Sequence, residues 1–296
     1  MDLLAISRVA GSCLLVSTPP AGGSPRLASI ERLVRIAGRT LGTGHAPAQN
    51  SRNTGTGMQD QSYLDDLSVR AAVAGWRAGE EVLSAEFRAA PVLTAGLIDR
   101  WLNFFGLTDR LRLGQREQFV GFLERTARPA LRDIGASSPE TFALVDEINF
   151  EAVRQRITSA SLTMLLSLFA CVYAPAIFSP ITQHSRRGIQ ILGHRLADMS
   201  YRSFMLAVMK EREHFADRIA ALRSAHEVAG NGFSPVPLDV VVMRALDQRL
   251  MLAGGYPPDE LEAVIRDRGA AAAAKDRIGR HRAAPGRPLQ ADRAAG

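Results

Sequence analysis

Apolar residues recur at every third or fourth position from Tyr63 to about residue 268, which is the period of an amphipathic α-helix. No stretch alternates apolar and polar residues for long enough to indicate a β-strand. Before residue 157 the pattern predicts helices over residues 63–87, 91–105, 108–123 and 139–156. The sequence therefore predicts an all-α domain.

Capping residues suggest where these helices begin and end. Pro91 suits the first turn of a helix, where a missing N–H costs nothing, and Gly106 suits the end of one. Thr108 is a suitable N-cap for the next helix. Ser138 and Pro139 are followed by an early acidic residue, so cap, proline and acid stand in the order typical of a helix start.

The most apolar stretch, residues 157–183, contains no Asp, Glu, Lys, Arg or His. It is long enough to cross a bilayer, which takes about 20 apolar residues, and arginines on both flanks leave its orientation open. Two interpretations fit: a membrane span through residues 157–181, or a buried helix that is apolar all round. Pro175 and Pro180 favour the buried helix, which would end near Ala174 and lead into a turn. Membrane helices tolerate proline, so the span stays open.

A long amphipathic helix is predicted over residues 185–229, because only two glycines interrupt the apolar period there. The part over 194–229 would alone be about 54 Å long at ~1.5 Å per residue. Such a helix packs along a bundle or pairs with a partner in a coiled coil. The expected partner face consists of Phe204, Val208, Phe215, Ile219 and Leu222. Two short helices, about 238–252 and 258–268, follow a turn-rich break.

The two ends of the chain lack this periodicity. Residues 1–62 contain one weakly helical stretch and a linker rich in Gly, Thr, Asn, Gln and Ser, and Met58 at its end could be the true start of the protein. Residues 269–296 form an alanine- and arginine-rich tail without apolar period. The expected architecture is thus an all-α multi-helix bundle over residues 63–268, built around the apolar central helix, with disordered termini.

The net charge of +6 belongs to these ends. Residues 1–57 carry a net charge of +4 and residues 266–296 one of +5, whereas residues 58–265 carry −3. Only Lys210 and Lys275 are lysines among the 36 basic residues, a bias typical of a GC-rich genome and not of selection for phosphate binding. A cationic DNA-binding face on the helical body is therefore less favoured.

Sequence signatures of enzymes are absent. Neither lysine follows a glycine, as a phosphate-binding P-loop requires, and there is no Gly-x-Ser-x-Gly elbow. Cys13 and Cys171 are too few and too far apart for a disulfide framework or a CxxC zinc site. Cys171 also lacks a basic neighbour in sequence that would activate its thiol. We predict no catalytic residue and no cofactor.

One pair of residues has the spacing of a metal site. Glu211 and His214 lie on one helical face, and ferritin-like di-metal bundles use this Glu-x-x-His spacing twice, together with two further glutamates. A second such pair is missing, and nothing indicates that Glu80, Glu81 or Glu151 converge on this one. A solvated charged face is the favoured interpretation, and no metal is predicted.

A helix-turn-helix-like pair over residues 93–123 is the main indication of nucleic-acid binding. Its second helix would carry Arg110, Arg112 and Arg116, although acidic residues lie among them. The basic tail, residues 269–296, could bind phosphates without sequence specificity.

The sequence favours a non-enzymatic helical interaction or structural protein of unknown process, with membrane association through residues 157–181 left open. The expected partner is another protein, or a second copy, on the 194–229 helix, and no small-molecule substrate is evident. The alternative is a DNA-associated accessory or regulatory protein that uses residues 93–123 and the basic tail. We expect a cytoplasmic or inner-membrane-associated protein, since Arg8 interrupts the apolar stretch near the N-terminus and no convincing signal peptide is present.

Overall fold

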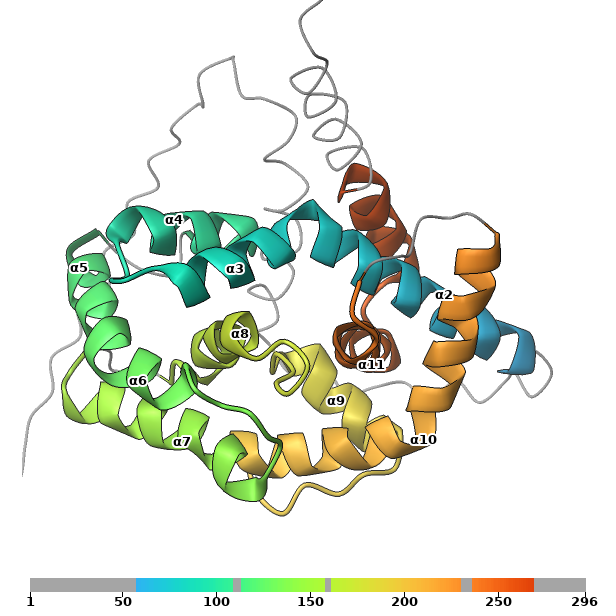
Figure 1. Ribbon diagram of the computed structural model, residues 1–296. Coiled ribbons are helices and arrows are strands. Elements are labelled where there is room, and N and C mark those ends of the chain that lie inside the picture. Colours follow the sequence, from blue (N-terminus) through green and yellow to red (C-terminus); the bar gives the residue numbers. More distant parts are fainter. Residues whose placement is uncertain (1–56, 109–112, 158–160, 230–235, 269–296) are drawn as a thin grey trace, which may run out of the picture.

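The computed structural model describes residues 57–108, 113–157, 161–229 and 236–268 (Figure 1). Within these ranges the regular elements are helices and none is a β-strand, which confirms the predicted all-α fold. Most of the arm predicted over residues 1–62, and the whole tail over 269–296, lie outside the described residues.

The helices follow one another closely along the chain. They are α2 (Gly57–Gly75), α3 (Glu81–Ala89), α4 (Ala95–Phe104), α5 (Leu113–Phe122), α6 (Arg128–Leu131), α7 (Pro139–Arg154), α8 (Thr163–Tyr173), α9 (Gln183–Ile191), α10 (Tyr201–Val228) and α11 (Leu238–Ala253). A last helix spans residues 258–268. Two π-helical turns, η1 (Trp76–Glu80) and η3 (Leu123–Ala127), join α2 to α3 and α5 to α6.

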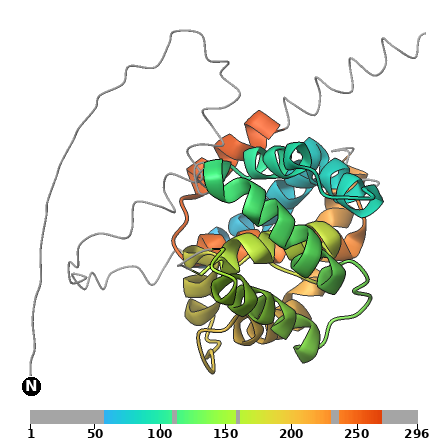
Figure 2. The same cartoon turned by 90° about the vertical axis from the view of Figure 1, so that its left-hand side faces the viewer.

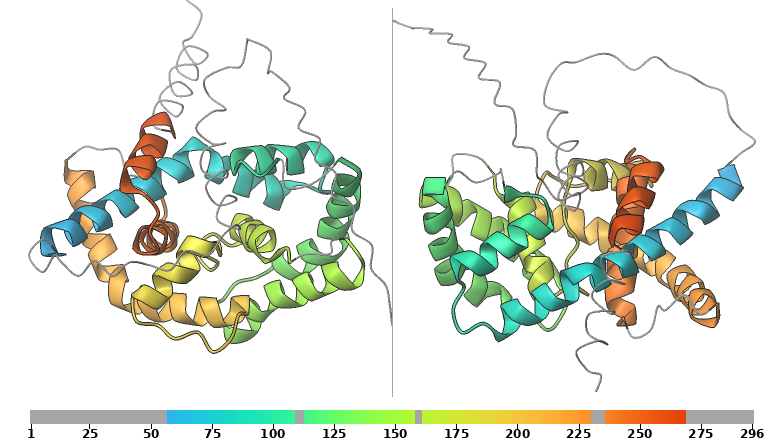
Figure 3. Two further views of the ribbon diagram at one scale, coloured as in Figure 1. Left: turned by 180° about the vertical axis from the view of Figure 1, so that it is seen from behind. Right: turned by 90° about the horizontal axis from the view of Figure 1, so that it is seen from above.

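Helices α8 and α11 lie in the interior of the molecule. Seen along α11, the helices α2 to α7 and α10 surround them (Figure 1), and the view from behind shows the same enclosure (Figure 3). Helix α11 packs on α2, α9 and α10, and α8 packs on α3 and α7. Helices α5, α6 and α7 form the end of the molecule that faces the viewer in Figure 2. The bundle is thus built around two central helices, where the sequence had indicated one.

The apolar run over residues 157–183 contributes the buried helix α8, which supports the core interpretation. Every residue from Leu165 to Pro175 is buried. Helix α8 has 11 residues, because Pro175 offers no N–H to continue it and forces Ala174 out of the helical region, to φ −133° and ψ 71°. Among the described residues, no helix combines the length and the apolar character needed to cross a membrane.

The long helix predicted over residues 185–229 is wrong as a single element, because the chain leaves the helix between α9 and α10. Gly193 has a φ of 91°, a left-handed conformation that ends α9. Helix α10 then starts anew, with the side chain of Ser200 accepting a hydrogen bond from the backbone N–H of Ser203. The carboxylate of Asp146 on α7 accepts two further N–H groups of this first turn. Helix α10 has 28 residues, about 42 Å at 1.5 Å per residue.

Other predicted boundaries were partly right. Helix α4 begins at Ala95, capped by Thr94, and not at Pro91, because the Thr94 side chain accepts the N–H of Leu97. The predicted start at Ser138 is confirmed: its hydroxyl accepts the N–H of Thr141 at 3.1 Å.

An ionic cluster connects α2 with α10 and α11. The carboxylate of Asp65 on α2 is fully buried and lies 2.7 Å from Nε of Arg218 on α10, and its other oxygen accepts a hydrogen bond from Arg249 on α11. Arg249 also covers the ring of Phe215 and lies 3.4 Å from a carboxylate oxygen of Glu211. Buried carboxylates require such partners, so these three helices depend on one another.

Helices α9 and α11 approach each other more closely than side chains would allow. A methyl group on Gly188 of α9 would come within 1.9 Å of the carbonyl oxygen of Leu250, and one on Gly254 within 1.9 Å of the carbonyl oxygen of His184. The two glycines face each other, with backbone atoms about 3 Å from either added methyl. This contact fixes how α9 lies against the end of α11.

We expect Gly188→Ala and Gly254→Ala each to lower the free energy of unfolding by about 3 kcal/mol, because the new methyl group meets backbone that cannot rotate away. Gly96→Ala is the matched control, since a methyl on this exposed helical glycine meets nothing within 4 Å. It should be neutral or stabilising by up to ~1 kcal/mol. Urea unfolding measures the change in the free energy of unfolding for all three variants. Equal changes for the buried and the exposed glycines would contradict the close contact.

Candidate functional site

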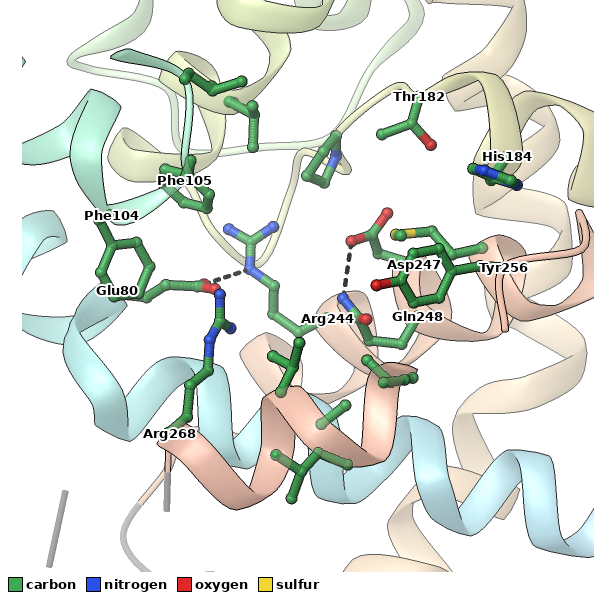
Figure 4. A pocket seen from close by; sticks show the side chains of 18 of the residues that line it. Glu80, Phe104, Phe105, Thr182, His184, Arg244, Asp247, Gln248, Tyr256 and Arg268 are labelled. Atoms are coloured by element: carbon green, nitrogen blue, oxygen red, sulfur yellow. Dashed lines mark hydrogen bonds and ion pairs between the residues drawn. The ribbon is translucent and has the colours of Figure 1, made fainter. Parts of the chain in front are cut away.

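A cavity of about 160 Å³ lies between α11, α9 and the 258–268 helix, and α8 and the loop after α4 complete its walls (Figure 4). Its apolar lining includes Leu107, Met164, Leu168, Met251, Leu261 and Ile265. An apolar cavity of ~150 Å³ holds a molecule of the size of benzene. Side chains of the 258–268 helix keep part of their surface exposed, so this helix lies between the cavity and solvent.

Polar side chains converge on the same cavity. They are Glu80, Thr182, His184, Arg244, Asp247, Gln248, Tyr256 and Arg268. They come from η1, from the start of α9, from α11 and from the residues after it. Large apolar walls combined with a few convergent polar groups are typical of small-molecule binding sites.

The first polar group is a buried ion pair. Nε of Arg244 lies 3.0 Å from a carboxylate oxygen of Glu80, and the two side chains are only 7% and 13% exposed. Arg244 also donates to the backbone carbonyl of Cys171 in the last turn of α8, at 3.3 Å. Glu80 is the last residue of the π-helical turn η1, a kind of irregularity that is frequent at functional sites.

Asp247 follows Arg244 by three residues and also faces the cavity (Figure 4). Gln248 donates a hydrogen bond to one carboxylate oxygen at 3.2 Å, and the hydroxyl of Ser179 lies beside the carboxyl group and favours its ionised form. Burial raises the pKa of Asp247 to about 7, although the positive charge of Arg244 opposes the shift. The carboxyl group is therefore largely protonated below neutral pH.

The remaining polar groups lie at the two sides of this centre. The guanidinium of Arg268 lies over the ring of Phe104, 5.3 Å from its centroid, and burial lowers its pKa. On the other side, Nδ1 of His184 donates to the carbonyl of Gly254 at 3.2 Å, and its ring packs edge-on against Tyr256. Burial also raises the pKa of Tyr256, and the carboxylate of Glu260 beside its hydroxyl adds to the shift.

This arrangement offers binding groups but no activated nucleophile. Burial raises the pKa of the Cys171 thiol to about 11, so that the thiolate is scarce at neutral pH. Within the described ranges, no group of three or more His, Cys, Asp and Glu side chains has a geometry that could hold a metal ion. The described residues of the lining supply hydrogen bonding, charge, apolar contact and, in Asp247, a carboxyl group with a pKa near neutral pH.

The predicted nucleic-acid residues are only partly described. Arg110 and Arg112 lie outside the described residues. Arg116 lies on α5, where its guanidinium pairs with Asp99 at 3.2 Å and donates to the carbonyl of Thr108 at 2.9 Å. The DNA-associated alternative stays a prediction.

The predicted partner face of α10 requires a correction, because it points into the protein's own core. The side chains of Phe204, Val208, Phe215 and Ile219 are buried, and Leu222 is half-buried against the same core. An apolar stripe on a helix marks a face that is covered, and here the chain's own helices cover it. In this structure the stripe is therefore not available to a partner.

Glu211 and His214 do not converge as a metal site would require. Glu211 is buried and accepts from Nε2 of His194 at 2.9 Å, whereas His214 is exposed. Glu81 is also exposed, and Glu151 pairs with a neighbouring arginine on the outside of α7. Of the glutamates considered from the sequence, Glu80 alone lines the cavity.

The sequence pattern did not single out Arg244, Asp247 or Arg268. A signal for the first two was present: both lie three residues apart in a stretch, residues 240–247, that is otherwise apolar. Charged residues on the apolar face of a helix are rarely buried unless they are paired. Glu80 and Arg268 gave no local signal, because only the tertiary fold brings them to α11.

Glu80→Gln should lower the free energy of unfolding by about 3 kcal/mol, since it leaves the buried guanidinium of Arg244 without its counter-ion. Glu80→Gln combined with Arg244→Met removes both charges and should recover most of this loss. Glu86→Gln is the control, because Glu86 pairs with Arg100 at the surface, and it should change stability by less than ~0.5 kcal/mol. If the losses in free energy of unfolding from Glu80→Gln and Arg244→Met simply added in the double variant, the two side chains would not be coupled as an ion pair.

Asp247→Asn should stabilise the protein at pH 8 by roughly 3 kcal/mol and leave its stability at pH 4 nearly unchanged. The folded state holds a proton on Asp247 up to a pKa of about 7, whereas the unfolded chain releases it near pH 4. Ionisation of this carboxyl group therefore lowers the free energy of unfolding of the wild-type protein as the pH rises from about 4 to 7. Urea unfolding at several pH values measures the difference, and a difference independent of pH would contradict a buried neutral carboxyl.

Comparisons of the chain with protein-family models, with curated proteins and with solved structures find no match. No family is therefore assigned to the chain.

Proposed function

We propose that this protein is a non-enzymatic binding protein that holds a small, largely apolar molecule in the cavity between α11, α9 and the 258–268 helix. The observation that carries the proposal is a single cavity in which apolar walls surround a few convergent polar side chains. Its size, about 160 Å³, suits a compact ring or a short chain.

Polar groups distributed over the lining support a binding role. Arg244 and Asp247 on α11, His184 on α9 and Arg268 on the 258–268 helix all line the cavity. A few polar groups among apolar walls fix the orientation of a ligand and give specificity.

The walls of the cavity belong to the framework of the fold. Arg244 and Asp247 lie on the central helix α11, and His184 lies beside the glycine contact that joins α9 to α11. Sites on packed helices hold their side chains in defined positions, which reduces the ordering cost of binding.

The proposal is tested by titration calorimetry with indole, an uncharged aromatic compound whose size matches a cavity of about 160 Å³. We expect saturable binding with one site per chain. Val264→Trp places a large side chain at the wall of the cavity on the half-exposed 258–268 helix, and it should weaken probe binding at least tenfold.

Val153→Trp is the matched control, because Val153 is exposed on α7 and does not line the cavity. It should leave probe affinity within twofold of wild type. Absence of saturable binding, or an equal loss in both variants, would overturn the proposed function.

A further inference from the structure

The charges around the cavity do not balance, and this points to the class of ligand. Arg244 and Arg268 are the cationic groups of the lining, apart from the histidine. Glu80 is paired with Arg244, whereas no carboxylate of the described residues lies within ion-pairing distance, 4.0 Å, of Arg268. The half-buried Arg268 thus has no direct counter-ion among the described residues, and the negative charge that acts on it is that of Glu80, which is already paired with Arg244.

Asp247 does not supply that counter-ion at or below neutral pH. Burial raises its pKa to about 7, so the carboxyl is then mainly neutral and acts as a hydrogen-bond donor. Burial at the same time lowers the pKa of Arg268, which indicates a cation whose lost hydration is not fully replaced. With Asp247 neutral, the lining carries one positive charge in excess.

The side chains are arranged so that a ligand could use this charge. In Figure 4 the guanidinium groups of Arg244 and Arg268 lie on the side of Phe104 and Phe105, and Asp247 lies between Arg244 and Tyr256. The apolar lining of α8 and of the 258–268 helix adjoins both groups. A molecule with one anionic end and an apolar body could place its anionic end at the guanidinium groups and its body against the apolar lining.

We infer, resting on the proposed binding function, that the ligand is a monocarboxylic acid with a compact apolar body, whose carboxylate binds at Arg268 and Arg244. A cavity of this size holds a body of roughly six to eight carbon atoms, by comparison with benzene in ~150 Å³. A dianion such as a phosphate monoester fits less well, because Glu80 is already present and only one positive charge is in excess. Planar guanidinium groups suit a carboxylate, which can accept two parallel hydrogen bonds.

The test compares the affinities of three compounds that share one apolar tail, each measured by titration calorimetry: octanoate, octan-1-ol and octylamine. At pH 6 octanoate should bind at least tenfold more tightly than octan-1-ol. Arg268→Gln should lower the affinity for octanoate about tenfold and change the affinity for octan-1-ol less than twofold. Arg266→Gln is the matched control, since Arg266 is exposed on the same helix and does not line the cavity, and it should change neither.

The pH gives a second readout. Octanoate affinity should fall several-fold between pH 6 and pH 8.5, as Asp247 ionises and removes the excess positive charge, and Asp247→Asn should abolish this dependence. The groups that act on Asp247 are Arg244 on its own helix, Glu80 from η1, and Ser179, Cys171 and Tyr201 from the neighbouring elements. His184 and Tyr256 line the same side of the cavity, and the affinity for octan-1-ol, measured at each pH, serves as the reference.

The outcomes separate the two proposals. If the neutral probe does not bind, the proposed function fails and the ligand class fails with it. If the probe binds but octanoate is no better than octan-1-ol, the binding function stands and the carboxylate inference is overturned. Tighter binding of octylamine than of octanoate would also overturn it, because Asp247 would then act as the counter-ion of a cation.

Discussion

The guanidinium of Arg244 is buried at the centre of the protein, and the arrangement of the surrounding elements depends on its neutralisation. Moving a cation out of water is costly unless an anion and further acceptors replace the water. Glu80 provides the anion from the π-helical turn between α2 and α3, and the last turn of α8 provides the carbonyl of Cys171. Three segments that are distant in the sequence therefore meet at one side chain of α11. The same side chain lines the cavity, so the stability of the fold and the charge of the candidate site have a common origin.

The contact between Gly188 and Gly254 complements this centre by fixing the opposite wall. Close backbone approach leaves no room for side chains between α9 and the end of α11, and it places His184 next to the chain that leads to Tyr256. The cavity is thus bounded by an ion pair on one side and by a backbone contact on the other. Between them lie the carboxyl group of Asp247, which accepts a hydrogen bond from Gln248, and the guanidinium of Arg268.

The helical fold could be predicted from the sequence because apolar period and capping chemistry are local. Ser138 caps its helix as expected, and Pro175 ends α8 near the expected residue. The break between α9 and α10 was missed, since it depends on the left-handed Gly193 and on the carboxylate of Asp146, a residue of another helix. The candidate site was missed for a similar reason. Arg244 and Asp247 are visible as charges in an apolar stretch, but their partners Glu80 and Arg268 reach them only through tertiary packing.

The buried carboxylate of Asp65 has a consequence for the order in which the chain can fold during synthesis. Its hydrogen-bonding partner Arg249 follows 184 residues later. At ~5–20 residues per second the ribosome needs about 10–40 s to add that length of chain. During this time α2 has been made but its partner helix α11 has not, and the face that carries Asp65 stays uncovered. The first helix of the bundle reaches its full set of contacts only when α11 emerges, so the nascent chain keeps this apolar surface exposed for most of its synthesis.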